Sequence, residues 1–329
     1  MFYNMYGPFA EKALIYAALI AGFVLTFALL KAFQHKLPGD IGRAYAVNAA
    51  AAKGKPRGAG VVFVPVYALL ILLFAPLTWE SICYAVLMIL AMLAGFLDDA
   101  SKKPWGEYKK GFIDLVISLA ITLVFIFNNT TSILLVYSGK TVMLPVWLYA
   151  VLGTVLVWAS INVVNCTDGV DGLSSTLSLL SMGAFIVLMN RESVAEHIGC
   201  CLPGVDFRVF IYGFMGVLGA YLLLNAGPSI MLMGDAGSRT IGVFFALAAM
   251  KSGSPLMFIP ICLVFIIDGG LGLIKVSLLR FLKIHILKNV RTPIHDHVRK
   301  NKGWSDAQTV IRFAVLHAVV LFAALFLIN

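Results

Sequence analysis

Long runs of apolar residues alternate with short polar segments along the whole chain. Ten such runs can be marked, at residues 12–33, 59–77, 81–97, 112–130, 144–164, 173–189, 208–226, 240–250, 255–274 and 308–328. Most approach the roughly 20 residues that a helix needs to cross the hydrocarbon core of a bilayer. The pattern predicts an all-α integral membrane protein with about ten transmembrane helices. The run at 240–250 is short, and we expect its helix to extend backward through Gly237.

The composition agrees with a membrane protein. Of the 329 residues, 60% are hydrophobic and only 12% are charged, whereas about a quarter of a soluble domain is charged. The first apolar run is too long for a signal-peptide core and has no small-residue cleavage site, so we interpret it as a span. Residues 131–143 contain a β-leaning stretch followed by Ser138-Gly139, which predicts a small external hairpin. A single membrane domain over residues 1–329 accommodates the whole chain.

The positive charges fall unevenly between the two sides of the predicted membrane. Most of the 25 Lys and Arg residues lie in the loops after spans 1, 3, 7 and 9. Because cytoplasmic loops carry an excess of these residues, we expect the odd-numbered loops in the cytoplasm and both termini outside. The net charge of +9 is then explained by topology and by attraction for anionic lipid or substrate, without nucleic acid.

The five cysteines are Cys83, Cys166, Cys200, Cys201 and Cys262. Their spacing is not that of a structural zinc site. We expect most of them to serve as small apolar packing residues.

Two adjacent carboxylates, Asp98 and Asp99, end the third apolar run. Neighbouring carboxylates at a membrane boundary repel each other unless a cation or a basic partner is near. Lys102 and Lys103 follow within one turn. The pair is either a solvated helix end or part of a cation site.

A second polar cluster separates the fifth and sixth apolar runs. It contains Asn162, Asn165, Asp168, Gly169 and Asp171, and no Lys or Arg. The two asparagines are three residues apart, so they share one helix face. Two successive Asp-Gly pairs predict tight turns with exposed backbone N–H groups. Carboxylates and amides in such a loop suit Mg²⁺, or the donors of a nucleobase and ribose.

A third cluster lies before the eighth apolar run. Asn225 precedes a Gly-Pro turn, and Asp235 stands between Gly234 and the pair Ala236-Gly237. Glycine lets the backbone approach a phosphate closely. Ser238 opens the next helix, whose N-terminus favours an anion.

The fourth cluster, Thr292 to His297, lies in a strongly basic loop. His295 and His297 flank Asp296, but further Cys or His ligands for zinc are not nearby. Contact with phosphates therefore fits the basic loop better than a zinc site does. The four clusters share one predicted membrane face, and their aspartates make a Mg²⁺–pyrophosphate arrangement available.

Together these motifs resemble those of the polyprenyl-phosphate N-acetylhexosamine-1-phosphate transferases, most closely the phospho-N-acetylmuramoyl-pentapeptide transferase branch. The resemblance runs over nearly the whole chain. The matching elements are Phe96-Leu97-Asp98-Asp99, Asn162 to Leu173, Met233-Gly234-Asp235-Ala236-Gly237-Ser238, Pro293-Ile294-His295-Asp296-His297 and Lys302-Gly303-Trp304-Ser305.

The resemblance implies a Mg²⁺-dependent enzyme of the bacterial inner membrane, with ten spans, a cytoplasmic active-site cleft and a homodimer. It implies transfer of phospho-MurNAc-pentapeptide from UDP-MurNAc-pentapeptide to undecaprenyl phosphate, giving lipid I and UMP.

Roles for individual residues follow from the same resemblance. Asp235 would bind Mg²⁺ with Asn165, and Asp98 would act as acid/base or as nucleophile beside Asp99. His295 and His297 would contact the donor. The remaining substrate-binding candidates are Asn162, Asn165, Asp168, Gly169, Asp171, Asn225, Lys102, Lys109, Ser238 and Asp296.

The chain departs from the family pattern at three places. Lys55-Pro56-Arg57-Gly58-Ala59-Gly60 replaces a Thr-Pro-Thr-Met-Gly-Gly element and adds two cations. Asp296 replaces the middle histidine of a triplet, and Leu232 replaces an aromatic residue three positions before Asp235. Every aspartate that the chemistry requires is retained.

Alternatives remain at this stage. A related transferase using UDP-GlcNAc is favoured by Asp296 and disfavoured by the Lys302 to Ser305 element. A transporter would hold its site near the bilayer midplane on broken helices, whereas these acids lie at one face. Asp268, inside the ninth apolar run, is either functional or a helix-packing residue near a glycine-rich kink, and is left outside the catalytic set.

Overall fold

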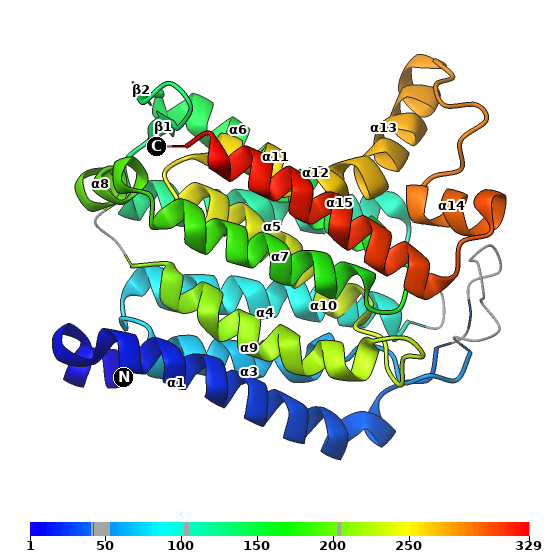
Figure 1. The fold of residues 1–329 in the computed structure, drawn as a ribbon, viewed down its shortest axis with the longest axis horizontal. Coiled ribbons are helices and arrows are strands. Elements are labelled where there is room, and N and C mark those ends of the chain that lie inside the picture. The colour runs from blue at the N-terminus through cyan, green and yellow to red at the C-terminus, as the bar shows by residue number, and fades with distance from the viewer. Residues whose placement is uncertain (41, 43–52, 102–104, 203–204, 329) are drawn as a thin grey trace.

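The structure is a computed structural model that describes residues 1–40, 42, 53–101, 105–202 and 205–328. Most of the elements are helices that lie side by side along the long axis of the molecule, as Figure 1 shows. In chain order they are α1 (Phe2–Phe33), η1 (Gln34–Lys36), α3 (Gly60–Phe74), α4 (Trp79–Asp99), α5 (Glu107–Asn128), β1 (Ser132–Leu135), β2 (Lys140–Met143), α6 (Val146–Thr167), α7 (Leu173–Met189), α8 (Glu192–Cys201), α9 (Arg208–Asn225), α10 (Gly234–Lys251), η2 (Pro255–Met257), α11 (Phe258–Ile261), α12 (Leu263–Phe265), η3 (Ile266–Gly270), α13 (Leu271–Ser277), η4 (Leu278–Leu282), α14 (Ile294–Lys302) and α15 (Asp306–Phe326).

The predicted helical membrane fold is confirmed at the level of its elements. Six of the described helical segments are long and apolar enough to cross a membrane. Two bent pairs raise the number to eight: α7 with α8 at 79°, and residues 255–261 with residues 263–282 at 68°. The second apolar run forms the shorter helix α3. Ten spans stays a prediction.

The eighth run forms the central helix, α10. It begins at Gly234 and all its residues are buried, which confirms the predicted backward extension. It packs against α3, α4 and α6. Because protein surrounds it, α10 can carry charged residues that a lipid-facing helix would expel.

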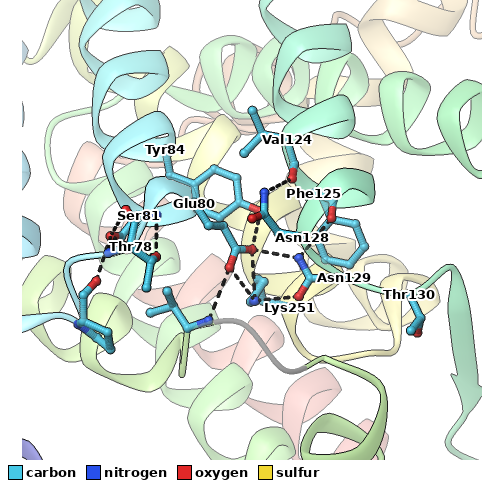
Figure 2. Close-up of polar contacts among 12 residues, drawn as sticks. Thr78, Glu80, Ser81, Tyr84, Val124, Phe125, Asn128, Asn129, Thr130 and Lys251 are labelled. Carbon is cyan, nitrogen blue, oxygen red and sulfur yellow. Dashed lines mark hydrogen bonds and ion pairs between the residues drawn. The ribbon is translucent and has the colours of Figure 1, made fainter.

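The far end of α10 joins α4 and α5 through a buried polar network, drawn in Figure 2. The Lys251 ammonium lies 3.1 Å from Glu80 and donates to Asn129 Oδ1 at 2.9 Å. Glu80 also accepts from Asn129 Nδ2 at 2.8 Å and from the Tyr84 hydroxyl at 2.9 Å. A buried ion pair is tolerated when its remaining hydrogen-bonding groups are satisfied in this way.

The predicted hairpin is also present. Strands β1 and β2 pair antiparallel, with Ser132 opposite Met143, and Gly139 takes a positive φ in the turn. Figure 1 places the hairpin at the same end of the bundle as α8, whereas α14 lies at the other end. The external position of the hairpin stays a prediction.

Candidate active site

Three aspartates lie close together at the end of the bundle where α14 lies. Asp98 and Asp99 end α4, and Asp235 lies in the first turn of α10. One oxygen from each carboxylate lies within 4.8 Å of the others. Asp99 also accepts a hydrogen bond from the backbone N–H of Asp235 at 2.6 Å. We call these three residues the carboxylate triangle; the sequence placed all three at one face, and the structure brings them into one site.

Two glycines allow this close approach. A Cβ atom at Gly95 would overlap the backbone of Asp235, so α4 and α10 touch at that point. Gly234 has a φ of +67°, and a Cβ atom there would collide with the Asp99 carboxylate. The left-handed conformation is costly for other residues. Glycine at both positions therefore sets the distance between the two acidic helix ends.

Arg57 neutralises part of the triangle's charge. Its guanidinium lies 2.6 Å from Asp99, 3.6 Å from Asp235 and 3.4 Å from Asp40. Burial alone would lower the pKa of Arg57, but the charges of Asp99, Asp235 and Asp40 raise it above its ordinary value. Arg57 thus stays charged, and the departure at residues 55–60 adds a cation directly to the site.

Two further cations, Lys110 and Arg239, pair with residues of the carboxylate triangle. Lys110 forms an ion pair with Asp98, which also accepts from the backbone N–H of Trp105 at 2.8 Å. Arg239 lies one turn after Asp235, at 3.6 Å, and donates to Asp114 at 2.5 Å. Asp98 is therefore held on two sides, and Asp235 is shared between two arginines.

The donor set fits Mg²⁺. Three carboxylates in one cluster are hard oxygen ligands, which Mg²⁺ prefers. Asn165, the other predicted ligand, donates to Ser238 at 2.9 Å, and Ser238 donates to the Gly234 carbonyl at 3.1 Å. Asn165 is thereby tied to the first turn of α10, beside Asp235.

The Asp-Gly loop between α6 and α7 is held in place by an ion pair and hydrogen bonds with neighbouring segments. Asp171 pairs with Lys55 at 3.2 Å and accepts from the Ser229 backbone at 3.0 Å. Asn225 accepts from the Gly172 backbone at 2.9 Å and donates to the Met231 carbonyl at 3.0 Å. These contacts bring the second and third predicted clusters together, through residues that hold the loop in place.

Asp268 links the π-helical turn η3 to the basic loop that contains His295. It lies on the π-helical turn η3, is fully buried, and accepts from both His295 Nδ1 and the His295 backbone N–H at 2.7 Å. The Nε2 edge of His295 lies directly against Gly169, and Arg299 approaches the Gly169 carbonyl at 3.5 Å. Single π-turns within helices are frequent at functional sites. The contact joins η3 to α14 through a predicted site histidine, and a functional role for Asp268 stays a prediction.

Comparison with known proteins agrees with this geometry. Residues 81–253 match the model of glycosyl transferase family 4. The chain is 39% identical to the phospho-N-acetylmuramoyl-pentapeptide-transferase of Treponema pallidum (strain Nichols), over 97% of this chain and 92% of that protein. The chain belongs to this family. It is also 29% identical to the Cutibacterium acnes protein of that name, over 83% of this chain and 84% of that protein, and 28% identical to the Campylobacter hominis one, over 83% and 81%.

As a member of the phospho-N-acetylmuramoyl-pentapeptide-transferase family, the chain is a bacterial integral membrane enzyme with phosphotransferase activity. The family-4 match includes the carboxylate triangle and the Asp-Gly loop but ends before Asp268 and His295. The second half of the site therefore relies on the matches that span nearly the full chain.

The other predicted site residues make ion pairs, hydrogen bonds or a cation–π contact. Asp296 lies 3.5 Å from Arg291 and 3.7 Å from Arg299, so two cations compensate its charge. His297 Nδ1 accepts from the Arg291 backbone at 3.2 Å. Lys109 stacks over the Trp105 ring at 3.6 Å, and Asn162 donates to the Trp158 carbonyl at 2.8 Å. Asp168 ends α6 and acts electrostatically on Arg57.

One predicted residue is not described by the structure, and several residues at the site were not predicted to belong to it. Lys102, one of the predicted substrate-binding residues, lies outside the described residues. Sequence reasoning did not assign Asp40, Lys110, Asp114 or Arg239 to the site, and it noted Lys55, Arg57 and Asp268 without placing them there. For Asp114 and Arg239 a signal existed: charged residues of opposite sign within apolar runs are costly unless paired.

Proposed function

We propose that this protein transfers phospho-MurNAc-pentapeptide from UDP-MurNAc-pentapeptide to undecaprenyl phosphate in peptidoglycan synthesis, giving lipid I and UMP. The observation that carries the proposal is the carboxylate triangle framed by Arg57, Lys110 and Arg239. Such a set binds a metal-complexed pyrophosphate and a second anionic phosphate together. The name shared by the relatives supplies the identity of the transferred group.

The transfer itself exchanges one phosphorus–oxygen bond for another. An oxygen of the acceptor phosphate bonds to the β-phosphorus of the donor. The bond from that phosphorus to the bridging oxygen breaks, and UMP leaves with the electron pair. When bound at the triangle, Mg²⁺ supplies charge neutralisation to the pyrophosphate. Lys110 and Arg57 offset the repulsion between the two anionic substrates.

Asp98 is the proposed acid/base residue. The Trp105 N–H and Lys110 hold its carboxylate at the edge of the triangle, where an acceptor phosphate would approach. In this role it removes the remaining proton of a monoprotonated acceptor phosphate. The alternative is a covalent phospho-Asp98 intermediate. A trapped sugar-phosphate adduct on Asp98 supports the covalent route, and kinetics that require a ternary complex support direct transfer.

The donor site is proposed to lie between the Asp-Gly loop and α14. His295 and Arg299 both reach Gly169, so the two segments already touch. Asp168 and Asp171 would face the uridine and its phosphates from one side, and His295 and His297 from the other. Hydrogen bonds of Asn165, Asn225 and Ser238 would hold this pocket in a fixed position relative to Asp235.

An apolar cavity suits the prenyl tail of the acceptor. It has a volume of about 630 Å³ and is lined almost entirely by carbon, from α6 and from the bent segment after η2. Its wall includes Trp158, whose indole N–H reaches the Gly111 carbonyl next to Lys110, and Gly270, in the same turn as Asp268. A lipid tail in this cavity would therefore bring its phosphate toward the triangle.

Topology and assembly complete the proposal. The ion-paired site, the loop 53–59 and α14 share one end of the bundle (Figure 1). The excess of Lys and Arg in the loops at that end supports a cytoplasmic position for it, with ten spans and both termini outside. We also propose a homodimer, on the family resemblance alone.

The test is UMP release by detergent-purified protein with both substrates, over a Mg²⁺ titration. We expect no release without Mg²⁺. Asp98→Asn and Asp235→Asn should each lower kcat by about a hundredfold or more. Glu107→Gln is the matched control, because Glu107 is an exposed acid paired with Arg280 beside the same site. Full activity in both aspartate variants would contradict the assignment of the site.

A further inference from the structure

A second cluster of metal-ligating side chains lies on α8, at the end of the bundle opposite the carboxylate triangle. His197, Cys200 and Cys201 are three and four residues apart, so they share one helix face. One ligand atom of each lies within 4.8 Å of the other two. Figure 1 shows α8 beside the hairpin and far from α14. The cluster is therefore separate from the proposed transferase site.

The imidazole of His197 has an unsatisfied nitrogen. The side chain is 5% exposed, and its buried Nε2 has no hydrogen-bond partner among the described residues. A buried polar atom without a partner is costly. A metal ion would satisfy this nitrogen, because a neutral imidazole nitrogen is a common metal ligand.

The two thiols are gathered next to that histidine. The Sγ atoms of Cys200 and Cys201 lie 3.2 Å apart, and Cys200 donates to the His197 carbonyl at 3.5 Å. Both cysteines are free. Two sulfurs and one imidazole form a soft donor set, which selects Zn²⁺ or Cu(I) over Mg²⁺. The sequence spacing alone favoured a packing role, because it does not show the buried Nε2.

We propose that α8 binds one thiophilic cation of the Zn²⁺ class through His197, Cys200 and Cys201, with a fourth position open to water. Binding releases the two thiol protons to solvent, and each thiolate donates an electron pair to the metal without a change in oxidation state. The site also reaches neighbouring elements. Thr130 donates to the Cys201 carbonyl at 2.9 Å, and Gly253 packs against the His197 ring. A bound cation thereby fastens a ten-residue helix, too short to be stable alone, to β1 and to the end of α10.

The test uses the full chain in detergent, reduced and stripped of metal with a chelator. Zn²⁺ is titrated against a chromophoric competitor, and Cd²⁺ is titrated while the ultraviolet thiolate-to-metal charge-transfer band is recorded. We expect one equivalent of cation and a charge-transfer band. The Cys200→Ser/Cys201→Ser variant should lose the band, and His197→Gln should weaken Zn²⁺ binding by about tenfold or more.

The control is Cys83→Ser/Cys262→Ser, which removes two thiols elsewhere and should keep both signals. The charge-transfer band separates this site from the carboxylate triangle, which contains no sulfur. UMP release by each variant shows that it is folded. The proposal is overturned by a wild-type protein without the band, by equal Zn²⁺ binding in Cys200→Ser/Cys201→Ser, or by a Cys200–Cys201 disulfide in protein isolated from membranes.

Discussion

At the scale of single residues, the site combines acids that are proposed to be catalytic with cations that pair with them. Arg57 bridges Asp99 and Asp235, at a place where the family pattern carries no cation. Asp268 holds His295 by two hydrogen bonds. The first contact places a positive charge among the carboxylates, and the second orients a histidine. Each leads to a separate prediction.

The first expectation concerns Mg²⁺. Arg57→Gln removes a positive charge that competes with the metal for Asp99 and Asp235, so Mg²⁺ should bind more tightly. We expect the Mg²⁺ concentration for half-maximal UMP release to fall by about threefold to tenfold. Arg280→Gln, which removes a partly exposed cation paired with Glu107, should leave it unchanged. A rise in the Mg²⁺ requirement of Arg57→Gln would show that Arg57 supports the metal instead.

The second expectation concerns His295. Asp268→Asn replaces a charge-assisted hydrogen bond worth about 1.5–3 kcal/mol. Because His295 then loses its orientation at Gly169, kcat/KM for the donor should fall by about tenfold or more. Asp206→Asn, which alters an acid paired with Arg208 at the other end, is the control. Full activity of Asp268→Asn would return Asp268 to a packing role.

At the scale of elements, α4 and α10 position the triangle because they are joined at both ends. Gly95 brings them into backbone contact beside Asp235, and the network of Glu80, Lys251 and Asn129 joins them at the far end (Figure 2). Contact at one end fixes the distance between Asp99 and Asp235. The ion pair at the other end fixes the axial register of the two helices.

Gly95→Ala tests the near contact. The added Cβ would overlap the Asp235 backbone, so the two helices must separate, at a cost of about 1–3 kcal/mol in unfolding free energy. UMP release should fall with it, because Asp235 moves away from Asp99. Gly183→Ala is the matched control on α7, where a Cβ meets nothing within 4 Å; it should be neutral or stabilising. Equal activity of the two variants would argue against tight coupling of the helix ends.

The far contact is tested by a double-mutant cycle. Lys251→Met or Glu80→Gln alone leaves a buried group without its charged partner and should destabilise by about 3–5 kcal/mol. The double variant should cost clearly less than the sum, because neither charge remains. Thermal unfolding in detergent measures each step. Strict additivity would mean that the two residues do not act as a pair.

At the scale of the whole molecule, the apolar pattern predicted most of the helices, and the positions of the acidic motifs between apolar runs predicted that they share one end of the bundle. The acidic motifs predicted the triangle, because each stood at the end of an apolar run. The two bent pairs and the start of α8 were not predictable from hydropathy, which does not register a change of direction within an apolar segment. Long-range partners such as Arg57 with Asp99 and Asp268 with His295 depend on packing between segments distant in sequence.

The central claim is the identity of the donor, and one measurement tests it directly. UMP release is compared for UDP-MurNAc-pentapeptide and UDP-GlcNAc, with undecaprenyl phosphate and saturating Mg²⁺. We predict release with the muramyl donor only, which would also show that Asp296, held between Arg291 and Arg299, is compatible with that substrate. Release with UDP-GlcNAc and none with the muramyl donor would contradict the account.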